Sequence, residues 1–338
     1  MPLAVRYKKT ELPFQYPFTI SKGTKTHQPA LLVELEHRGA RGYGEAPAIA
    51  YYNIPVEKMI EDLERKKIFV EKFAFTDPER YWHYLHHLFP QNHFLVCALD
   101  IATWDMYGKL RKKPLYQLWN LDYSKAPLCD YTIGIDTEDM IRKKVEDAQQ
   151  FKILKVKLGL DTDKMIIDTI RSVTDVPLCA DVNQGWKNKE EALEMANWLH
   201  ERNVVFLEQP MPKEMIDENA WLTEHSPIPT IADEGCQRLA DVTALQGIYT
   251  GINIKLMKCT GMREAKQMAE LARALDMKVM LGCMTETSCA ISAAAQLAPL
   301  VDWADLDGAL LIGNDIYEGM YVENGLCKLP DRPGIGII

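Results

Sequence analysis

The chain has 338 residues, of which 47% are hydrophobic and 26% charged, as in ordinary folded globular proteins. Its 39 Lys and Arg against 48 Asp and Glu give a formal net charge of −9, which argues against a nucleic-acid or anionic-membrane partner. The sequence contains no apolar run of about 18 residues and no apolar signal-peptide core near its start. We therefore expect a cytoplasmic protein whose eight cysteines are buried free thiols.

The first 125 or so residues have the pattern of an α+β domain. An alternating run at 31–37 predicts a strand that turns at 37–39 into a second strand near Tyr43. The pattern then becomes helical from about 56 to 120, with a long and largely buried helix interrupted at Pro114. The predicted helical segments are 56–67, 78–89 and 97–119.

From about residue 128, short β-branched runs alternate with amphipathic helices at a spacing of about 25 residues. Eight such βα units fit a closed parallel barrel. The alternative is a doubly wound open sheet, which usually has five or six strands and a glycine-rich phosphate turn, but neither GxGxxG nor GxxxxGK[ST] occurs. The predicted strands are 129–135, 153–159, 177–181, 204–208, 229–233, 252–256, 278–282 and 302–307.

Two of these strands carry lysines where a covered strand should be apolar. Lys155 and Lys157 are two residues apart and therefore share one face, and Asn253 and Lys255 repeat the pattern on a strand roughly opposite in the barrel. Barrel active sites lie at the carboxyl ends of the strands. The lysines are therefore candidate catalytic residues; in an open antiparallel sheet they would simply face water.

Three consecutive predicted strands end in a carboxylate, namely Asp181, Glu208 and Asp233. Unpaired carboxylates on one rim repel each other, and a hard divalent cation such as Mg²⁺ removes that conflict through all-oxygen ligation. Helix capping is the alternative and could account for one of the aspartates, but glutamate is not a preferred cap. The sequence thus predicts a magnesium site.

The last strand carries a second anionic pair, Asp305 and Asp307, which face the same way. They could be caps or loop hydrogen-bond partners, or a pair that grips a substrate ammonium. A metal that holds a substrate carboxylate stabilises the enediolate formed when the α-proton leaves. A neutral lysine on each face of that carbon can remove and return the proton, which predicts racemisation or epimerisation, and the neighbouring charges should lower the lysine pKa.

These motifs together resemble the enolase superfamily, and within it the muconate-lactonising subgroup. The resemblance rests on Lys155-Val156-Lys157, on the three carboxylates in DVNQGW, LEQP and ADE, and on Lys255 in INIKLMK. It implies an α/β fold in which an N-terminal α+β capping domain covers a (β/α)7β TIM-like barrel. The implied capping domain is 1–125, completed by about 318–338, and the implied barrel is 126–317.

The pair Asp305-x-Asp307 is similar to that of the dipeptide epimerases, which bind the substrate ammonium there and the carboxylate at the metal. The resemblance implies Lys157 and Lys255 as the two bases, with Lys155 beside the substrate carboxylate and one Mg²⁺ per subunit. It also implies a dipeptide as substrate, a homo-oligomer, and capping loops at about 17–26 and 47–56 that shape specificity. The implied substrate-contacting residues further include Thr132, Lys22, Gly23, Lys25, Ile54, Met284 and Thr285, with Asn183 and Glu234 beside the metal.

One position departs from the Ala-Glu epimerases, which carry an arginine in the first capping loop where this chain has Gly23. Lys22 or Lys25 could substitute for it, but the departure favours small or uncharged second residues, as do Ile49, Tyr51 and Ile54. The alternative enzymes are an o-succinylbenzoate synthase, an N-acylamino acid racemase or a cycloisomerase, whose substrates lack a free ammonium. A non-catalytic barrel would be expected to have lost one of the two lysines.

Overall fold

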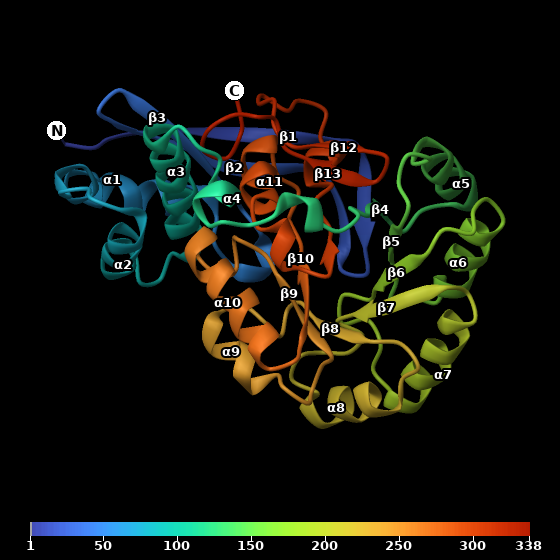
Figure 1. Ribbon diagram of the computed structural model, residues 1–338. Helices are drawn as coiled ribbons and strands as arrows, with labels where there is room; N and C mark the ends of the chain where they lie inside the picture. Colours follow the sequence, from blue (N-terminus) through green and yellow to red (C-terminus); the bar gives the residue numbers. More distant parts are fainter. Residues whose placement is uncertain (1) are drawn as a thin grey trace.

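Two sheets of different type organise the computed structural model, which describes residues 2–338 (Figure 1). The first is a three-stranded antiparallel sheet in the order β1-β2-β3, and the second is an eight-stranded parallel sheet in the order β11-β10-β9-β8-β7-β6-β5-β4. No helix among these residues is long and apolar enough to cross a bilayer.

The antiparallel sheet and the helices that follow it form the capping domain. Leu31, Val33 and Leu35 alternate along β2 and are fully buried, which directs one face of the sheet toward the core. Helix α3 lies against β3 because Gly42 and Gly44 have no side chain; a Cβ at either position would lie 1.9 Å from a carbonyl oxygen of α3. The elements are β1 (Ala4–Ile20), β2 (Gly23–His37), β3 (Ala40–Pro47), α1 (Val56–Lys72), α2 (Pro78–Leu88), α3 (His93–Arg111) and α4 (Leu115–Leu118).

The parallel sheet curls into a TIM-like barrel with helices on its outside (Figure 1). Its two edge strands are joined where Cys129 pairs with Ala304 and the Asp130 amide donates to the Ala304 carbonyl at 3.0 Å. The strands are β4 (Tyr131–Ile133), β5 (Leu154–Lys157), β6 (Leu178–Asp181), β7 (Val204–Glu208), β8 (Thr230–Ala232), β9 (Gly251–Ile254), β10 (Lys278–Leu281) and β11 (Trp303–Ala304). The helices between them are α5 (Glu138–Asp147), α6 (Asp163–Arg171), α7 (Lys189–His200), α8 (Ile216–His225), α9 (Leu239–Ala244), α10 (Met262–Ala274) and α11 (Ser288–Ala295).

All eight barrel strands overlap the ranges that the sequence predicts, and the helix break at Pro114 is present. The long strand β1 was missed, and the predicted loop at 17–26 is the tip of the β1–β2 hairpin. Pro13 and Pro17 account for the miss, since proline lacks the N–H that a strand donates. The ladder tolerates them because its register shifts between Pro13 and Phe18.

The end of the chain returns to the capping domain. The Ile335 amide donates to Asp105 of α3 at 3.0 Å, and Gly334 packs so tightly against Asp105 that a Cβ would overlap its carboxylate. Figure 1 shows this C-terminal segment, with its short strands β12 (Tyr321–Glu323) and β13 (Leu326–Lys328), beside the N-terminal sheet.

Glu45 of β3 joins the capping domain to the barrel. Its carboxylate is fully buried and accepts hydrogen bonds from the Thr287 amide at 3.0 Å and from the Thr287 hydroxyl. Burial, together with the nearby charge of Asp315, raises the pKa of Glu45 from its ordinary 4.5 to about 7. The folded protein therefore keeps this proton between about pH 4.5 and 7, where the unfolded chain has lost it.

We expect the stability contribution of Glu45 to fall as the pH rises through that window, because ionising it costs more in the folded state. Glu45→Gln keeps an oxygen acceptor for Thr287 and cannot ionise. The free energy of unfolding of the variant, relative to that of the wild type, should therefore rise by on the order of 1–3 kcal/mol from pH 5 to pH 8. Urea unfolding at the two pH values measures this difference, with the exposed Glu190→Gln as control. A difference that does not change with pH would contradict the raised pKa.

Candidate active site

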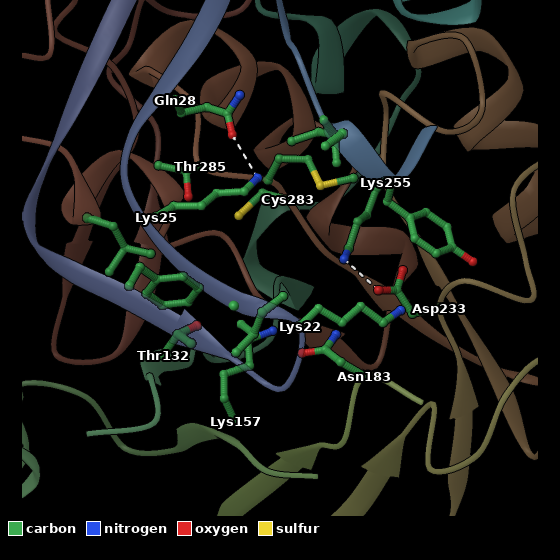
Figure 2. Close-up of a pocket in the computed structure, with 18 of the residues that line it drawn as sticks. Lys22, Lys25, Gln28, Thr132, Lys157, Asn183, Asp233, Lys255, Cys283 and Thr285 are labelled. Carbon is green, nitrogen blue, oxygen red and sulfur yellow. Dashed lines mark hydrogen bonds and ion pairs between the residues drawn. The ribbon is translucent and has the colours of Figure 1, made fainter. Parts of the chain in front are cut away.

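A cavity of about 440 Å³ lies between the capping domain and the carboxyl ends of the barrel strands (Figure 2). The β1–β2 hairpin and the segment at 49–52 cover it from one side, and strand ends form its floor and walls. The predicted site residues that line it are Lys22, Gly23, Lys25, Thr132, Lys155, Lys157, Asn183, Asp233, Glu234, Lys255, Met284, Thr285, Asp305 and Asp307.

The strand register explains why the charged residues meet. Lys157 pairs across β5 and β6 with Asp181, and Asp181 pairs across β6 and β7 with Glu208, so all three lie at one level of the rim. The Lys157 ammonium donates to Asp181 at 2.6 Å. Asp181 and Glu208 are fully buried and lie beneath the cavity, where lysine side chains cover them.

Lys155 is the central cation of this floor and is 1% exposed. Its Nζ lies 2.6 Å from Asp305, 2.7 Å from Glu208 and 3.2 Å from Asp181. Burial alone would lower the pKa of Lys155, but these carboxylates outweigh it and raise the pKa well above its ordinary value. Lys155 therefore links the Asp305 side of the cavity to the carboxylates of β6 and β7.

Lys255 lies on the other side of the cavity and donates to Asp233 at 2.7 Å (Figure 2). Burial would lower the pKa of Lys255, but Asp233 and Glu208 raise it well above its ordinary value. The nearest charged partner of Lys255 is thus a carboxylate, which favours the charged ammonium. The predicted lowering of a lysine pKa includes the effect of Mg²⁺ and stays a prediction.

The three strand-end carboxylates have the chemistry of a hard-cation site. Glu208 Oε2 is buried and lies 2.7 Å from the Lys155 ammonium, but no donor among residues 2–338 meets it in hydrogen-bond geometry. Asn183 Oδ1 and Glu234 Oε2 are buried oxygens that likewise lack a donor. Burial and the charge of Asp181 raise the pKa of Glu208 to about 7, as expected where negative charge is under-compensated. The oxygens present therefore fit Mg²⁺.

A second group, Cys283, Asp305 and Asp307, has its potential ligand atoms within 4.8 Å of one another. The Thr132 amide donates to Asp307 at 2.6 Å, and burial beside Asp305 raises the pKa of Asp307 to about 7. A thiol is a poor ligand for Mg²⁺, which prefers oxygen. Two carboxylates at one end of the cavity instead suit a substrate ammonium.

One residue predicted to contact the substrate lies outside the cavity. Ile54 packs against the hydrophobic core and does not line the cavity. Asn53 ends the turn at 50–52 in a left-handed conformation, with φ of 54°, and redirects the chain before Ile54. Ile49 and Tyr52 line the cavity from this segment instead.

Several buried supports of the site were missed by the sequence analysis. Asn253 donates to Glu208 at 2.6 Å, and Gln209 accepts from the Asp233 amide at 3.0 Å. Lys258, three residues after Lys255, is also buried against Asp233. Two of these residues could have been found from the sequence. Gln209 directly follows the predicted ligand Glu208, and Asn253 shares a strand face with the predicted base Lys255.

The fold and the charged cavity define a barrel enzyme with a capping domain. Residues 3–119 match the mandelate racemase / muconate lactonizing enzyme N-terminal domain, and residues 139–338 match the enolase C-terminal domain-like family. The chain belongs to the mandelate racemase and muconate lactonizing enzyme family of the enolase superfamily.

Three known proteins are similar to this chain over most of their length. The L-Ala-D/L-Glu epimerase of Bacteroides thetaiotaomicron is 52% identical over 97% of this chain and 86% of its own length. A dipeptide epimerase of Cytophaga hutchinsonii, solved with Mg and D-Ala-L-Val, has a TM-score of 0.92 at 26% identity, covering 100% and 96% of the two chains. An N-succinyl Arg/Lys racemase of Bacillus cereus reaches a TM-score of 0.91 at 27% identity, covering 100% and 95%.

We expect Lys155→Met to be strongly destabilising, because it leaves three buried carboxylates without their shared cation. Breaking a buried ion pair in this way typically costs about 3–5 kcal/mol. Lys157→Met is the matched control, since Lys157 contacts Asp181 alone and is slightly more exposed. Chemical denaturation in EDTA measures the free energy of unfolding of the two variants. An equal decrease in both would contradict a central role for Lys155.

Proposed function

We propose that the protein is an isomerase that epimerises dipeptides at the α-carbon of the C-terminal residue. The observation that carries this proposal is the presence of two anionic groups at one cavity. Asp305 and Asp307 line one end, and Asp233 lines the other, with Asp181 and Glu208 beneath the cavity floor. Lysines from β5 and from the end of β9 stand between them. The relatives named for dipeptide epimerisation support the same substrate class.

The cofactor is Mg²⁺, and Asp181, Glu208 and Asp233 are the residues that would hold it. The donor-free oxygen of Glu208 supports this assignment, as does the magnesium in the Cytophaga hutchinsonii structure. When bound, Mg²⁺ supplies a Lewis acid for the substrate carboxylate and the negative charge that develops on it. Asn183 and Glu234 flank these carboxylates and complete the polar wall.

Lys157 and Lys255 are the proposed acid–base pair. Strands β5 and β9 are separated by three strands on one side of the eight-stranded sheet, which places the two lysines across the barrel from each other. Both line the cavity, and each ammonium pairs there with a single carboxylate. One lysine would remove the α-proton from one face and the other would return a proton to the opposite face, which inverts the carbon. Lys155 supports the charge between them.

The ammonium site distinguishes the proposal from its alternatives. An o-succinylbenzoate synthase, an N-acylamino acid racemase or a cycloisomerase acts on a substrate without a free ammonium. Asp305 and Asp307 would then lie buried at one end of the cavity with no cation to compensate both of them, since Lys155 forms an ion pair with Asp305 but not with Asp307. A free α-ammonium provides that charge.

The preference for a small or uncharged second residue rests on the missing arginine at Gly23. The apolar wall near the hairpin, which includes Phe18, Ile20 and Ile49, supports it. The alternative candidate is a substrate whose C-terminal residue is acidic, and the environment of Lys25 favours it. Lys22 lies 3.7 Å from Glu234, whereas Lys25 reaches only the Gln28 side chain at 3.4 Å (Figure 2).

Lys25 also meets the physical conditions for binding an anion. Burial lowers the pKa of Lys25, and none of the carboxylates of residues 2–338 forms an ion pair with it. A desolvated ammonium in a substrate cavity is stabilised by a substrate carboxylate, typically by about 1.5–3 kcal/mol. The Bacteroides thetaiotaomicron relative is named for a glutamate at this position.

We also propose the finer architecture that the sequence predicts. The seven helices between the eight strands, together with the Cys129–Ala304 pairing, support a closed (β/α)7β barrel. The gap between the two family matches, from residue 119 to 139, supports a boundary between a capping domain at 1–125 and a barrel that begins at 126. The hydrogen bond from the Ile335 amide to Asp105 supports the completion of the capping domain by about 318–338, which leaves the barrel at 126–317. We further propose that the protein forms a homo-oligomer.

We predict that Lys157→Ala and Lys255→Ala each abolish epimerisation, because each removes the proton donor on one face. Each variant should still exchange the α-proton of one stereoisomer with D₂O, and the two variants should select opposite stereoisomers. Proton NMR of an Ala-Ala solution in D₂O with Mg²⁺ follows both processes, and EDTA should stop them. Epimerisation by Lys255→Ala at the wild-type rate would exclude the two-base mechanism.

The acidic candidate predicts that Lys25→Met lowers kcat/KM for Ala-Glu by roughly 10- to 150-fold and leaves Ala-Ala within about threefold, whereas the uncharged preference predicts that the wild type already favours Ala-Ala over Ala-Glu. The reason for the loss is that the variant lacks the ammonium that would contact the substrate's glutamate carboxylate, and Ala-Ala has no such carboxylate. Lys22→Met is the matched control, because Lys22 is already paired with Glu234. If Lys25→Met leaves Ala-Glu unchanged, the acidic candidate fails and the uncharged preference stands.

The same assay tests the ammonium site through N-acetyl-Ala-Ala, which lacks the positive charge. Its kcat/KM should be far below that of Ala-Ala, since no cation then pairs with Asp307. A preference for the acetylated compound would instead indicate that the protein is an N-acylamino acid racemase.

A further inference from the structure

Two lysines of the same turn contact Asp233 in different ways. Lys255 lines the cavity and donates only to Asp233 Oδ2, at 2.7 Å. Lys258 does not line the cavity, and its side chain is completely buried. The two residues therefore approach Asp233 from opposite sides, one from the cavity and one from within the protein.

Every hydrogen of the Lys258 ammonium has an acceptor. Its Nζ donates to Asp233 Oδ1 at 2.7 Å, to the Asp233 carbonyl at 2.6 Å and to the Asn253 carbonyl at 2.9 Å. An ammonium has three donors, so none is left to exchange a proton with a substrate. This geometry excludes Lys258 as a base and leaves it a positioning role.

The position of Lys258 joins two of the strands that build the cation site. Asp233 follows β8, and Asn253 lies in β9, where its side chain holds Glu208 at 2.6 Å. Lys258 fixes the backbone of both strands and one oxygen of Asp233 at the same time. The other Asp233 oxygen is thereby aimed at the cavity side, where Lys255 meets it.

We propose that Lys258 is a positioning residue that orients Asp233 for Mg²⁺. The inference rests on the proposed function only in taking Asp233 as a metal ligand. Burying a cation requires compensation by several hydrogen bonds, and here all of them go to the carboxylate and backbone of the cation site. Groups that orient metal ligands typically contribute 10- to 100-fold to metal affinity.

A purely electrostatic role makes the opposite prediction. Lys258 carries a positive charge close to the site, and losing that charge alone would strengthen the binding of a divalent cation. Loss of orientation would weaken it. The sign of the change in Mg²⁺ affinity therefore distinguishes the two roles without any measurement of catalysis.

The experiment is a calorimetric titration of Mg²⁺ into the metal-free protein in the absence of dipeptide. We expect Lys258→Met to raise the Kd for Mg²⁺ by about 10- to 100-fold. If this variant does not fold, Lys258→Gln replaces it; glutamine keeps two N–H donors, and the Kd should then rise by about 3- to 10-fold. Circular dichroism with and without Mg²⁺ confirms that the titrated variant is folded.

Lys109→Met is the matched control, because it removes a lysine that pairs at 2.6 Å with the fully buried Asp105 of α3, away from the cavity. It should lower the melting temperature and leave the Kd for Mg²⁺ within twofold. A Lys258→Met protein that binds Mg²⁺ as tightly as the wild type, or more tightly, would overturn the inference alone. A wild-type protein that binds no Mg²⁺ would overturn both this inference and the proposed cofactor.

Discussion

The compensation of buried charge at the mouth of the barrel is the interaction on which the rest of the site depends. Carboxylates and ammoniums there are withdrawn from water, and each is tolerable only because the other is present. Lys155 makes this mutual dependence clearest, since among residues 2–338 it alone contacts carboxylates at the ends of three strands. The groups involved are Asp181, Glu208, Asp233, Asp305 and Asp307 with Lys155, Lys157, Lys255 and Lys258.

The same compensation separates the roles of chemically identical side chains. Lys155 and Lys258 have several carboxylate or carbonyl partners and are held in place, whereas Lys157 and Lys255 each pair with one carboxylate and lie open to the cavity. Asp233 and Glu208 raise the pKa of Lys255. A cation that bound those carboxylates would weaken this effect and lower the pKa of the amine.

The sequence was sufficient for the barrel and for the charged rim, because both follow from strict patterns. Strands covered on both faces must be apolar, so Lys157 and Lys255 were conspicuous exceptions. Lys258 carried no such signal, since a lysine in a turn is normally solvated and only the tertiary fold buries it. Strand β1 was hidden by its prolines and charged residues, and the misplacement of Ile54 depended on the backbone conformation of Asn53, which no periodicity encodes.

The β1–β2 hairpin has a consequence for how this enzyme can change over evolutionary time. Its tip supplies Lys22 and Lys25 to the cavity, while every lysine and carboxylate proposed for the chemistry comes from the barrel. The register of the hairpin ladder shifts between Pro13 and Phe18, and the tip residues beyond that shift pair with one another in the ladder. Substitutions there can alter which side chain is accepted while the proton-transferring groups stay intact. Substrate range is thus the readily evolvable property of this architecture, and the reaction itself is the constrained one.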